Sequence, residues 1–159
     1  MLVFNRNRSI TCEKEGNWGL IIRASSVDTF HEMFLIMTID MEIREIVEAT
    51  GELIRGPYTF CRETMALLAV LKKMKVDRGI SKEVVTKIGG PGGCTQFVDL
   101  VLEALRAVGQ CEESFVTGAE GFDSLGYWHG KLAGKCYAHS HSLEDKRLHK
   151  SVSAVLTGN

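Results

Sequence analysis

Hydrophobic and polar residues alternate along the first half of the chain, as they do in β-strands. The segment Glu32–Asp40 carries apolar residues at both odd and even positions, so we expect a strand that is either buried on both faces or covered by helices. A turn signal at Gly16–Gly19 precedes a second strand, which starts at Leu20, and a turn at Asp40–Glu42 leads into a third strand over Ile43–Leu53. These segments predict a small, mostly antiparallel sheet of about three strands or more.

After Pro57 the apolar residues follow the period of helices. Cys61–Met74 is amphipathic, and Ser81 is a suitable N-cap for a short helix that ends at Ile88. A further helix follows a glycine-rich run and is predicted by one apolar stripe: Val98, Val101, Leu102, Leu105 and Val108. Strands followed by helices predict an α+β fold in which the helices pack on one face of the sheet.

The pattern weakens beyond Cys111, where glycines recur at short intervals. We expect residues 1–136 to form a single domain and residues 137–159 to form a polar C-terminal tail with the composition of a mobile segment. Within that tail, Leu148, Val152 and Val155 have the spacing of one short helix.

Composition and charge narrow the class of protein. The 159 residues include 19 Lys and Arg against 20 Asp and Glu, and 45% are hydrophobic, which is typical of a globular domain. A near-zero net charge argues against a nucleic-acid or anionic-membrane partner. Met33–Ile39, the longest apolar stretch, is too short to span a membrane, and no apolar segment follows Arg6 and Arg8 as it would in a signal peptide. We expect a cytoplasmic protein whose partner is a protein or a small molecule, and Glu32–Asp40 is a candidate for pairing across a homodimer.

The cysteines also favour a reducing compartment. There are five, an odd number without paired short spacings: Cys12, Cys61, Cys94, Cys111 and Cys136. Such a set is a poor disulfide framework. A functional cysteine in this chain is therefore expected to be a metal ligand or a nucleophile, and the simpler alternative for each is a buried core residue.

The glycine-rich run Gly89–Gly93 lies directly before Cys94. It lacks the Lys-Ser/Thr of a phosphate-binding P-loop and follows a helix rather than a strand. Its more natural role is to let the backbone approach closely around Cys94, at the start of the next helix. The N–H groups and the dipole at a helix start favour a thiolate. Cys61, 33 residues earlier, has the same position at the start of the preceding helix.

Two further residues make a metal site with these cysteines conceivable. Asp28 and His31 flank the entry to the central predicted strand, and in a loop both can turn toward one point. Asp28, His31, Cys61 and Cys94 would be acceptable ligands for tetrahedral zinc, and also for iron. The alternative is that Asp28 caps a turn with Thr29 while His31 is a solvated residue at the sheet edge.

A second metal-like cluster, Cys136-x-x-His139-x-His141, lies near the C-terminus. It has no paired Cys-x-x-Cys, and its histidines stand in a polar stretch, so a solvated tail is the simpler interpretation. The sequence has no Ser/His/Asp arrangement with a nucleophile elbow.

Several short segments, taken in order, resemble a known family. They are Arg6, Arg8, Ile10, Gly16, Trp18, Asp28-Thr29, His31, Met33, Ile39-Asp40, Pro57, Cys61 and the run from Ile88 to Thr95. Over roughly Arg6 to Cys136 this succession resembles an uncharacterised bacterial family, domain of unknown function 2889, with its Gly-Gly-x-x-Gly-Cys-Thr run. It is also distantly similar to the NifU/IscU/SufE iron–sulfur scaffold fold, a three-stranded antiparallel sheet followed by helices.

The resemblance implies roles for individual residues. The two helix-opening cysteines of the scaffold fold fall on Cys61 and Cys94, and its early Cys and Asp fall near Asp28 to His31, where this chain has no cysteine. With only two thiolates, assembly of an iron–sulfur cluster is not expected. Gln96 stands where the family pattern leads us to expect His, and an amide can only form hydrogen bonds.

Three hypotheses follow. In the first, the domain handles metal or sulfur: the four residues hold zinc or iron, or Cys61 and Cys94 carry sulfur transiently. In the second, it is a non-enzymatic module that binds a small ligand or a protein, and the same cysteines are structural. In the third, Cys94 is a catalytic thiol with His31 as its base, for which no motif is present.

Overall fold

The computed structural model describes residues 1–112, 115 and 123–141. The chain divides into two compact units, Met1–Val116 and Thr117–Asn159, and each is described by itself. This division lies about twenty residues before the boundary at residue 136 that the sequence suggested. The short helix expected through Leu148, Val152 and Val155 falls outside the described residues.

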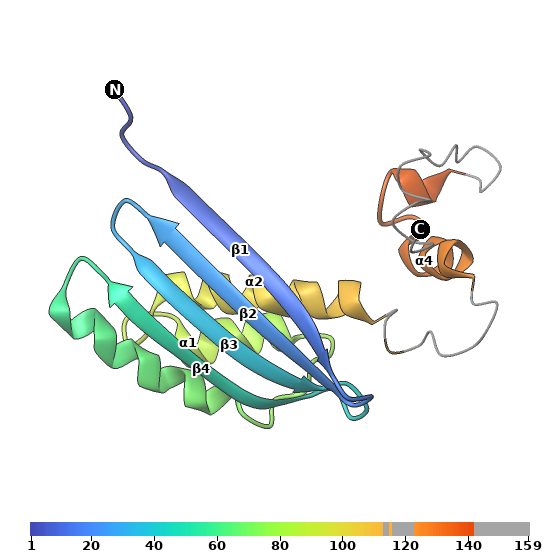
Figure 1. Ribbon diagram of the computed structural model, residues 1–159, viewed down its shortest axis with the longest axis horizontal. Coiled ribbons are helices and arrows are strands. Elements are labelled where there is room, and N and C mark those ends of the chain that lie inside the picture. Colours follow the sequence, from blue (N-terminus) through green and yellow to red (C-terminus); the bar gives the residue numbers. More distant parts are fainter. Residues whose placement is uncertain (113–114, 116–122, 142–159) are drawn as a thin grey trace. The chain divides into compact units, whose positions relative to one another are not determined.

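The first unit is built on a four-stranded antiparallel sheet in which each strand pairs with the next (Figure 1). Its strands are β1 (Arg6–Glu15), β2 (Gly19–Asp28), β3 (Glu32–Asp40) and β4 (Glu45–Arg55). The β1–β2 register is regular from the pair Arg6 and Asp28 onward. Two irregularities occur between β3 and β4. Sequential hairpins of this kind need only short turns, which the sequence supplies.

Three helices cover one face of this sheet. They are η1 (Thr59–Leu71, a 3₁₀-helix), α1 (Ile80–Ile88) and α2 (Thr95–Cys111), and Figure 1 shows them on the same side of the strands. The inward residues of the strands and the apolar stripe of α2 form one continuous core that includes Met37, Leu68 and Phe97. The predicted α+β fold with helices on one sheet face is thus confirmed.

Gly51 in β4 permits this close packing. A Cβ atom at that position would lie 2.5 Å from Cδ1 of Leu68 and 2.8 Å from the carbonyl oxygen of Phe34. Real Cβ atoms do not approach other heavy atoms so closely, so only glycine lets η1 lie this near the sheet.

The opposite face of the sheet is not covered by the helices of the first unit. Phe34 and Ile36 of β3 point to that face and are 39% and 44% exposed. Of the two alternatives for Glu32–Asp40, burial on both faces is therefore wrong for this unit, and coverage by helices holds for one face. Apolar residues on both faces of a strand show that it favours β-structure, but they do not show what covers each face.

Strand β1 was not among the expected strands, because its outward residues and two of its inward residues are polar. Arg6 and Arg8 are both half-buried. Each is accommodated by an ion pair with an acidic side chain, to Asp28 and to α2 respectively, that the sequence does not reveal.

In the second unit the described elements are α4 (Ser124–Leu132) and η2 (Ala138–Ser140). The carboxylate of Asp123 caps α4 by accepting a hydrogen bond from the Gly126 backbone N–H at 2.9 Å. Over the ranges described above, no helix is both long and apolar enough to cross a membrane.

Candidate thiol pocket

The glycine-rich loop closes on itself and holds Cys94 at the first position before α2. The Cys94 backbone N–H donates to the carbonyl of Ile88 at 2.9 Å, and the Gly93 N–H donates to Gly90 at 3.1 Å. Cys94 is the N-cap residue of α2, and the helix continues from Thr95. The prediction that Cys94 stands at a helix start is therefore confirmed.

Three of the glycines in this loop are needed where they are, and at Gly89 a Cβ atom would lie 2.5 Å from the carbonyl oxygen of Val85. Gly90 has a φ of +72°, in the left-handed region that favours glycine. At Gly93 a Cβ atom would collide with the carbonyl oxygens of Ile88 and Gly89. Gly92, in contrast, has no atom within 4 Å of where its Cβ would lie. The loop thus depends on particular glycines for its geometry.

Cys61 reaches the same region from the opposite side. It lies near the start of η1, where its backbone N–H donates to the carbonyl of Tyr58 at 3.1 Å. The Thr64 hydroxyl donates back to the Cys61 carbonyl at 2.7 Å. Tyr58 and Phe60 stack beside it with their ring centroids 5.1 Å apart.

Cys61 and Cys94 line one open pocket of about 430 Å³. Both side chains are half-buried and pack against the edge of the core. The other lining residues are Phe60, Glu63, Thr64, Leu67, Pro91, Gly92 and Gly93. Two thiols, a carboxylate and a hydroxyl thus face an otherwise apolar space that is large enough for a small molecule.

The sequence did not single out Glu63 and Thr64 as site residues. The signal was present in the spacing, because both follow Cys61 within one helical turn. Among the described residues that line this pocket, Glu63 carries a carboxylate and none is a lysine, arginine or histidine.

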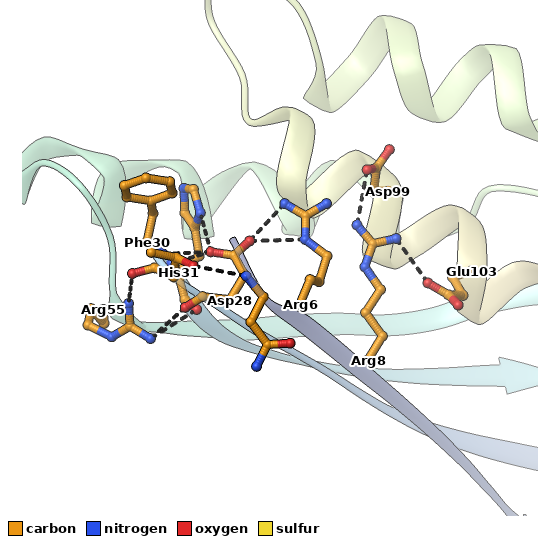
Figure 2. A network of polar contacts seen from close by, with 10 residues as sticks. Arg6, Arg8, Asp28, Phe30, His31, Arg55, Asp99 and Glu103 are labelled. Carbon is orange, nitrogen blue, oxygen red and sulfur yellow. Dashed lines mark hydrogen bonds and ion pairs between the residues drawn. The ribbon is translucent and has the colours of Figure 1, made fainter. Parts of the chain in front are cut away.

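Asp28 and His31 belong to a different structure, a polar corner at the β2–β3 turn (Figure 2). Oδ2 of Asp28 accepts from Nε and Nη2 of Arg6 at 3.0 and 2.7 Å. Oδ1 accepts from the backbone N–H groups of Phe30 and His31 at 2.8 and 2.7 Å, and it lies 3.2 Å from Nδ1 of His31. Both carboxylate oxygens are thus engaged within the corner.

Arg55 closes the corner from β4. Its guanidinium donates to the carbonyl oxygens of Asp28 at 2.8 Å and Thr29 at 2.9 Å (Figure 2). Burial alone would raise the pKa of Asp28, but the N–H groups of Phe30 and His31 and the Arg6 guanidinium outweigh it, so this pKa lies well below its usual range. The corner therefore keeps this buried carboxylate ionised at neutral pH.

These contacts bear on the four predicted metal ligands. Asp28 acts as a turn cap, the alternative that the sequence left open, while the His31 side chain is only 18% exposed rather than solvated. Among the described residues, no three His, Cys, Asp or Glu side chains are placed to hold a metal ion together. The structure thus pairs Asp28 with His31 and Cys61 with Cys94, and zinc or iron at all four stays a prediction.

Gln96 occupies the first turn of α2, where its Oε1 is buried without a hydrogen-bond partner. In the second unit, Cys136 is exposed, and the Ser140 N–H and hydroxyl both donate to the Cys136 carbonyl. The ring of His141 lies against Tyr137 with centroids 4.6 Å apart. These local contacts describe a short turn around Cys136, His139 and His141.

A comparison with protein families finds one match. The model of a family described as protein of unknown function (DUF2889) matches residues 13–110, more than half of the chain. The matched span contains Asp28, His31 and Arg55 of the polar corner but not Arg6, and it contains the glycine-rich loop and both cysteines of the pocket. No curated protein and no solved structure matches the chain.

Proposed function

The chain belongs to the DUF2889 family, whose function is unknown, and from that premise we propose that this domain is a sulfur-handling module working through the thiols of Cys61 and Cys94. The observation that carries this proposal is their shared pocket. Two thiols that are far apart in sequence line one open space, and a loop of sterically required glycines sets the position of one of them.

The surroundings of Cys94 suit a nucleophilic thiol. The positive end of the α2 dipole lies at this residue, and it favours a negative charge there. The thiol is half-buried and lines an open pocket, so a small sulfur donor can reach it. Cys61 provides a second thiol in the same space.

The chemistry is exchange of one sulfur atom. The Cys94 thiolate attacks the outer sulfur of a small persulfide, RS–SH, and a new S–S bond forms as the old one breaks. The bonding electron pair leaves with RS⁻, and Cys94 then carries the persulfide Cys94–S–SH. Attack by an acceptor thiolate on the outer sulfur returns Cys94 to its thiolate by the same exchange. No external oxidant or reductant is consumed.

The test is persulfide uptake at pH 7. The full chain is incubated with glutathione persulfide, and the added sulfur is located by mass spectrometry of peptides. We expect one added sulfur on Cys94, lost in Cys94→Ser, and slower transfer onward in Cys61→Ser. Cys136→Ser is the matched control, because Cys136 is exposed and lies outside the pocket.

Two results would contradict the proposal. If sulfur is taken up in order of exposure, with Cys136 first and Cys94 unlabelled, the pocket cysteines are structural and the domain is a binding module. If protein purified without chelator holds about one equivalent of zinc or iron that Cys61→Ser and Cys94→Ser both lose, the pocket is a metal site instead.

A further inference from the structure

A second pair of cysteines lies at the other end of α2. Cys12 is an inward-facing residue of β1, and Cys111 is the last residue of α2. They are 99 residues apart in sequence, and each lies one residue outside the span that the family model matches. Their side chains are hydrogen-bonded to each other, and both pack against the edge of the core.

The place where the two thiols meet is open to solvent. Both line a pocket of about 440 Å³ together with Ile10, Glu103, Arg106, Ala107 and Gln110. A small oxidant can therefore reach this contact. The Arg106 guanidinium and the Glu103 carboxylate are the charged groups that line this pocket.

The two elements that carry these thiols are held together independently of them. Arg8 of β1 donates to Asp99 and to Glu103 of α2, each at 3.1 Å (Figure 2). Arg8 and Cys12 point to the same face of β1, and Glu103 is two helical turns before Cys111. The Arg8 contacts therefore hold β1 against α2, with both thiols at one pocket, without a bond between the cysteines.

We propose that Cys12 and Cys111 form a redox-active dithiol that is oxidised to an intramolecular disulfide by small disulfides such as glutathione disulfide. The Cys111 thiolate attacks one sulfur of the oxidant, forms a mixed disulfide and releases one glutathione thiolate. Cys12 then loses its proton and attacks the Cys111 sulfur, which forms the protein disulfide and releases the second glutathione. Two protein thiols are oxidised and one glutathione disulfide is reduced to two thiols.

The order of attack follows from the environment of Cys12. Burial raises the pKa of Cys12 to about 12, with a further contribution from the hydrogen bond to Cys111 and the charge on it. At neutral pH Cys12 is therefore a thiol that donates to the Cys111 sulfur. Once Cys111 is in a mixed disulfide, its contribution to the raised pKa of Cys12 is gone while burial remains, so Cys12 loses its proton more readily than before and completes the exchange.

Oxidation would tie the first strand to the end of the last helix of the sheet unit. The closed loop contains nearly all of that unit, and long loops give the largest restriction of the unfolded chain. We expect the midpoint of thermal unfolding to rise by about 5–10 °C on oxidation.

The experiment uses the full chain in a glutathione redox buffer. We expect two of the five thiols to be lost on oxidation, and peptide mapping to recover Cys12 joined to Cys111. In Cys12→Ser the reaction should stop at the Cys111 mixed disulfide, and the oxidation-dependent rise in the unfolding midpoint should vanish. Cys136→Ser should behave as wild type.

The proposal is overturned if the wild-type chain forms no disulfide between Cys12 and Cys111 in a buffer that oxidises exposed dithiols. It is equally overturned if oxidation joins other cysteines instead. Neither result touches the sulfur-handling proposal, because wild-type Cys61 and Cys94 lie at the opposite end of α2 and are tested separately.

Discussion

The two ends of α2 place cysteine pairs in opposite surroundings. At the N-terminal end, Cys94 and Cys61 face an open pocket bounded by a glycine loop. At the C-terminal end, about 25 Å away along a 17-residue helix, Cys111 and Cys12 are in direct hydrogen-bonding contact. The helix dipole favours a negative charge at the first end.

The difference shows that the reactivity of a cysteine thiol depends on its surroundings in the fold. A thiol in an open pocket at the positive end of a helix suits exchange with an incoming small molecule. Two thiols in contact with each other, one held protonated by burial and by its neighbour, suit reversible joining of two chain segments. The following variants either distinguish the reactivity of the two cysteine pairs or remove a contact on which the reactivity of one pair depends.

The largest expected effect is on the alkylation of Cys12. A pKa of about 12 leaves roughly a thousandfold less thiolate at pH 7 than an ordinary cysteine has. We expect iodoacetamide to modify Cys12 about a thousandfold more slowly than the exposed Cys136, with the rate rising about tenfold per pH unit up to pH 12. Peptide-resolved rates measure this, and comparable rates at pH 7 would contradict it.

Cys111→Ser sharpens the same comparison. It removes the neighbouring sulfur, so the pKa of Cys12 should fall toward its ordinary value and its alkylation at pH 7 should become faster. The remaining charged groups that line this pocket, Glu103 and Arg106, are unchanged in this variant. An unchanged rate would show that burial alone controls Cys12.

The next effect is on stability at the polar corner. Asp28→Asn removes the charge that Arg6 and two backbone N–H groups bind, and we expect the free energy of unfolding to fall by about 3 kcal/mol. Because the folded state lowers the pKa of Asp28, its contribution is present above the unfolded value of about 3.9 and is lost as the pH falls. Denaturant unfolding from pH 7 to pH 3 measures both.

The same variant also tests whether the polar corner and the thiol pocket are separate sites. If the corner is structural, Asp28→Asn should be less stable yet should still take up sulfur at Cys94 under conditions where it is folded. Loss of sulfur uptake in a folded Asp28→Asn chain would instead place Asp28 in the same site as the two cysteines.

A smaller effect is expected in the glycine loop. Gly93→Ala puts a methyl group against the carbonyl oxygens of Ile88 and Gly89, so we expect a loss of about 2 kcal/mol of stability and slower sulfur uptake at Cys94. Gly92→Ala is the matched control, because its methyl group would meet no atom within 4 Å. Equal behaviour of the two variants would show that the loop does not position Cys94.

The smallest effect concerns the link between β1 and α2. Arg8→Met removes two ion pairs with partly exposed carboxylates, which we expect to cost about 1 kcal/mol or less. The Cys12–Cys111 disulfide should then form more slowly in glutathione buffer, while sulfur uptake at Cys94 stays as in wild type. Slower reaction at both ends would show a general loosening of α2 instead.

Local sequence patterns predicted the positions of Cys94 and Cys61, the cysteine pair at the N-terminal end of α2. The apolar stripe from Val98 to Val108 and the preceding glycines define the start of α2, and therefore the position of Cys94. The helical period after Pro57 did the same for Cys61, although the element is a 3₁₀-helix that begins two residues earlier, at Thr59. Helix starts have sequence signals, so residues beside them can be placed from sequence.

The position of the second pair, Cys12 and Cys111, depends on contacts between segments that are far apart in sequence. Cys12 meets Cys111 only because β1 joins the sheet at its edge and α2 packs across it, and the half-buried arginines of β1 gave no hydrophobic pattern for that strand. The polar corner likewise takes Arg6 from β1 and Arg55 from β4 to the turn at Asp28. Charges matched across distant strands leave no periodic signal in a single sequence.

One measurement tests the account most directly: the competition for sulfur between the two ends of α2 within the same molecule. The full chain is exposed briefly to glutathione persulfide at pH 7, and the added sulfur on each cysteine is quantified by peptide mass spectrometry. The account predicts that Cys94 gains sulfur first and that Cys12 gains none. Uptake at Cys12 before Cys94, or uptake at the exposed Cys136 alone, would contradict it.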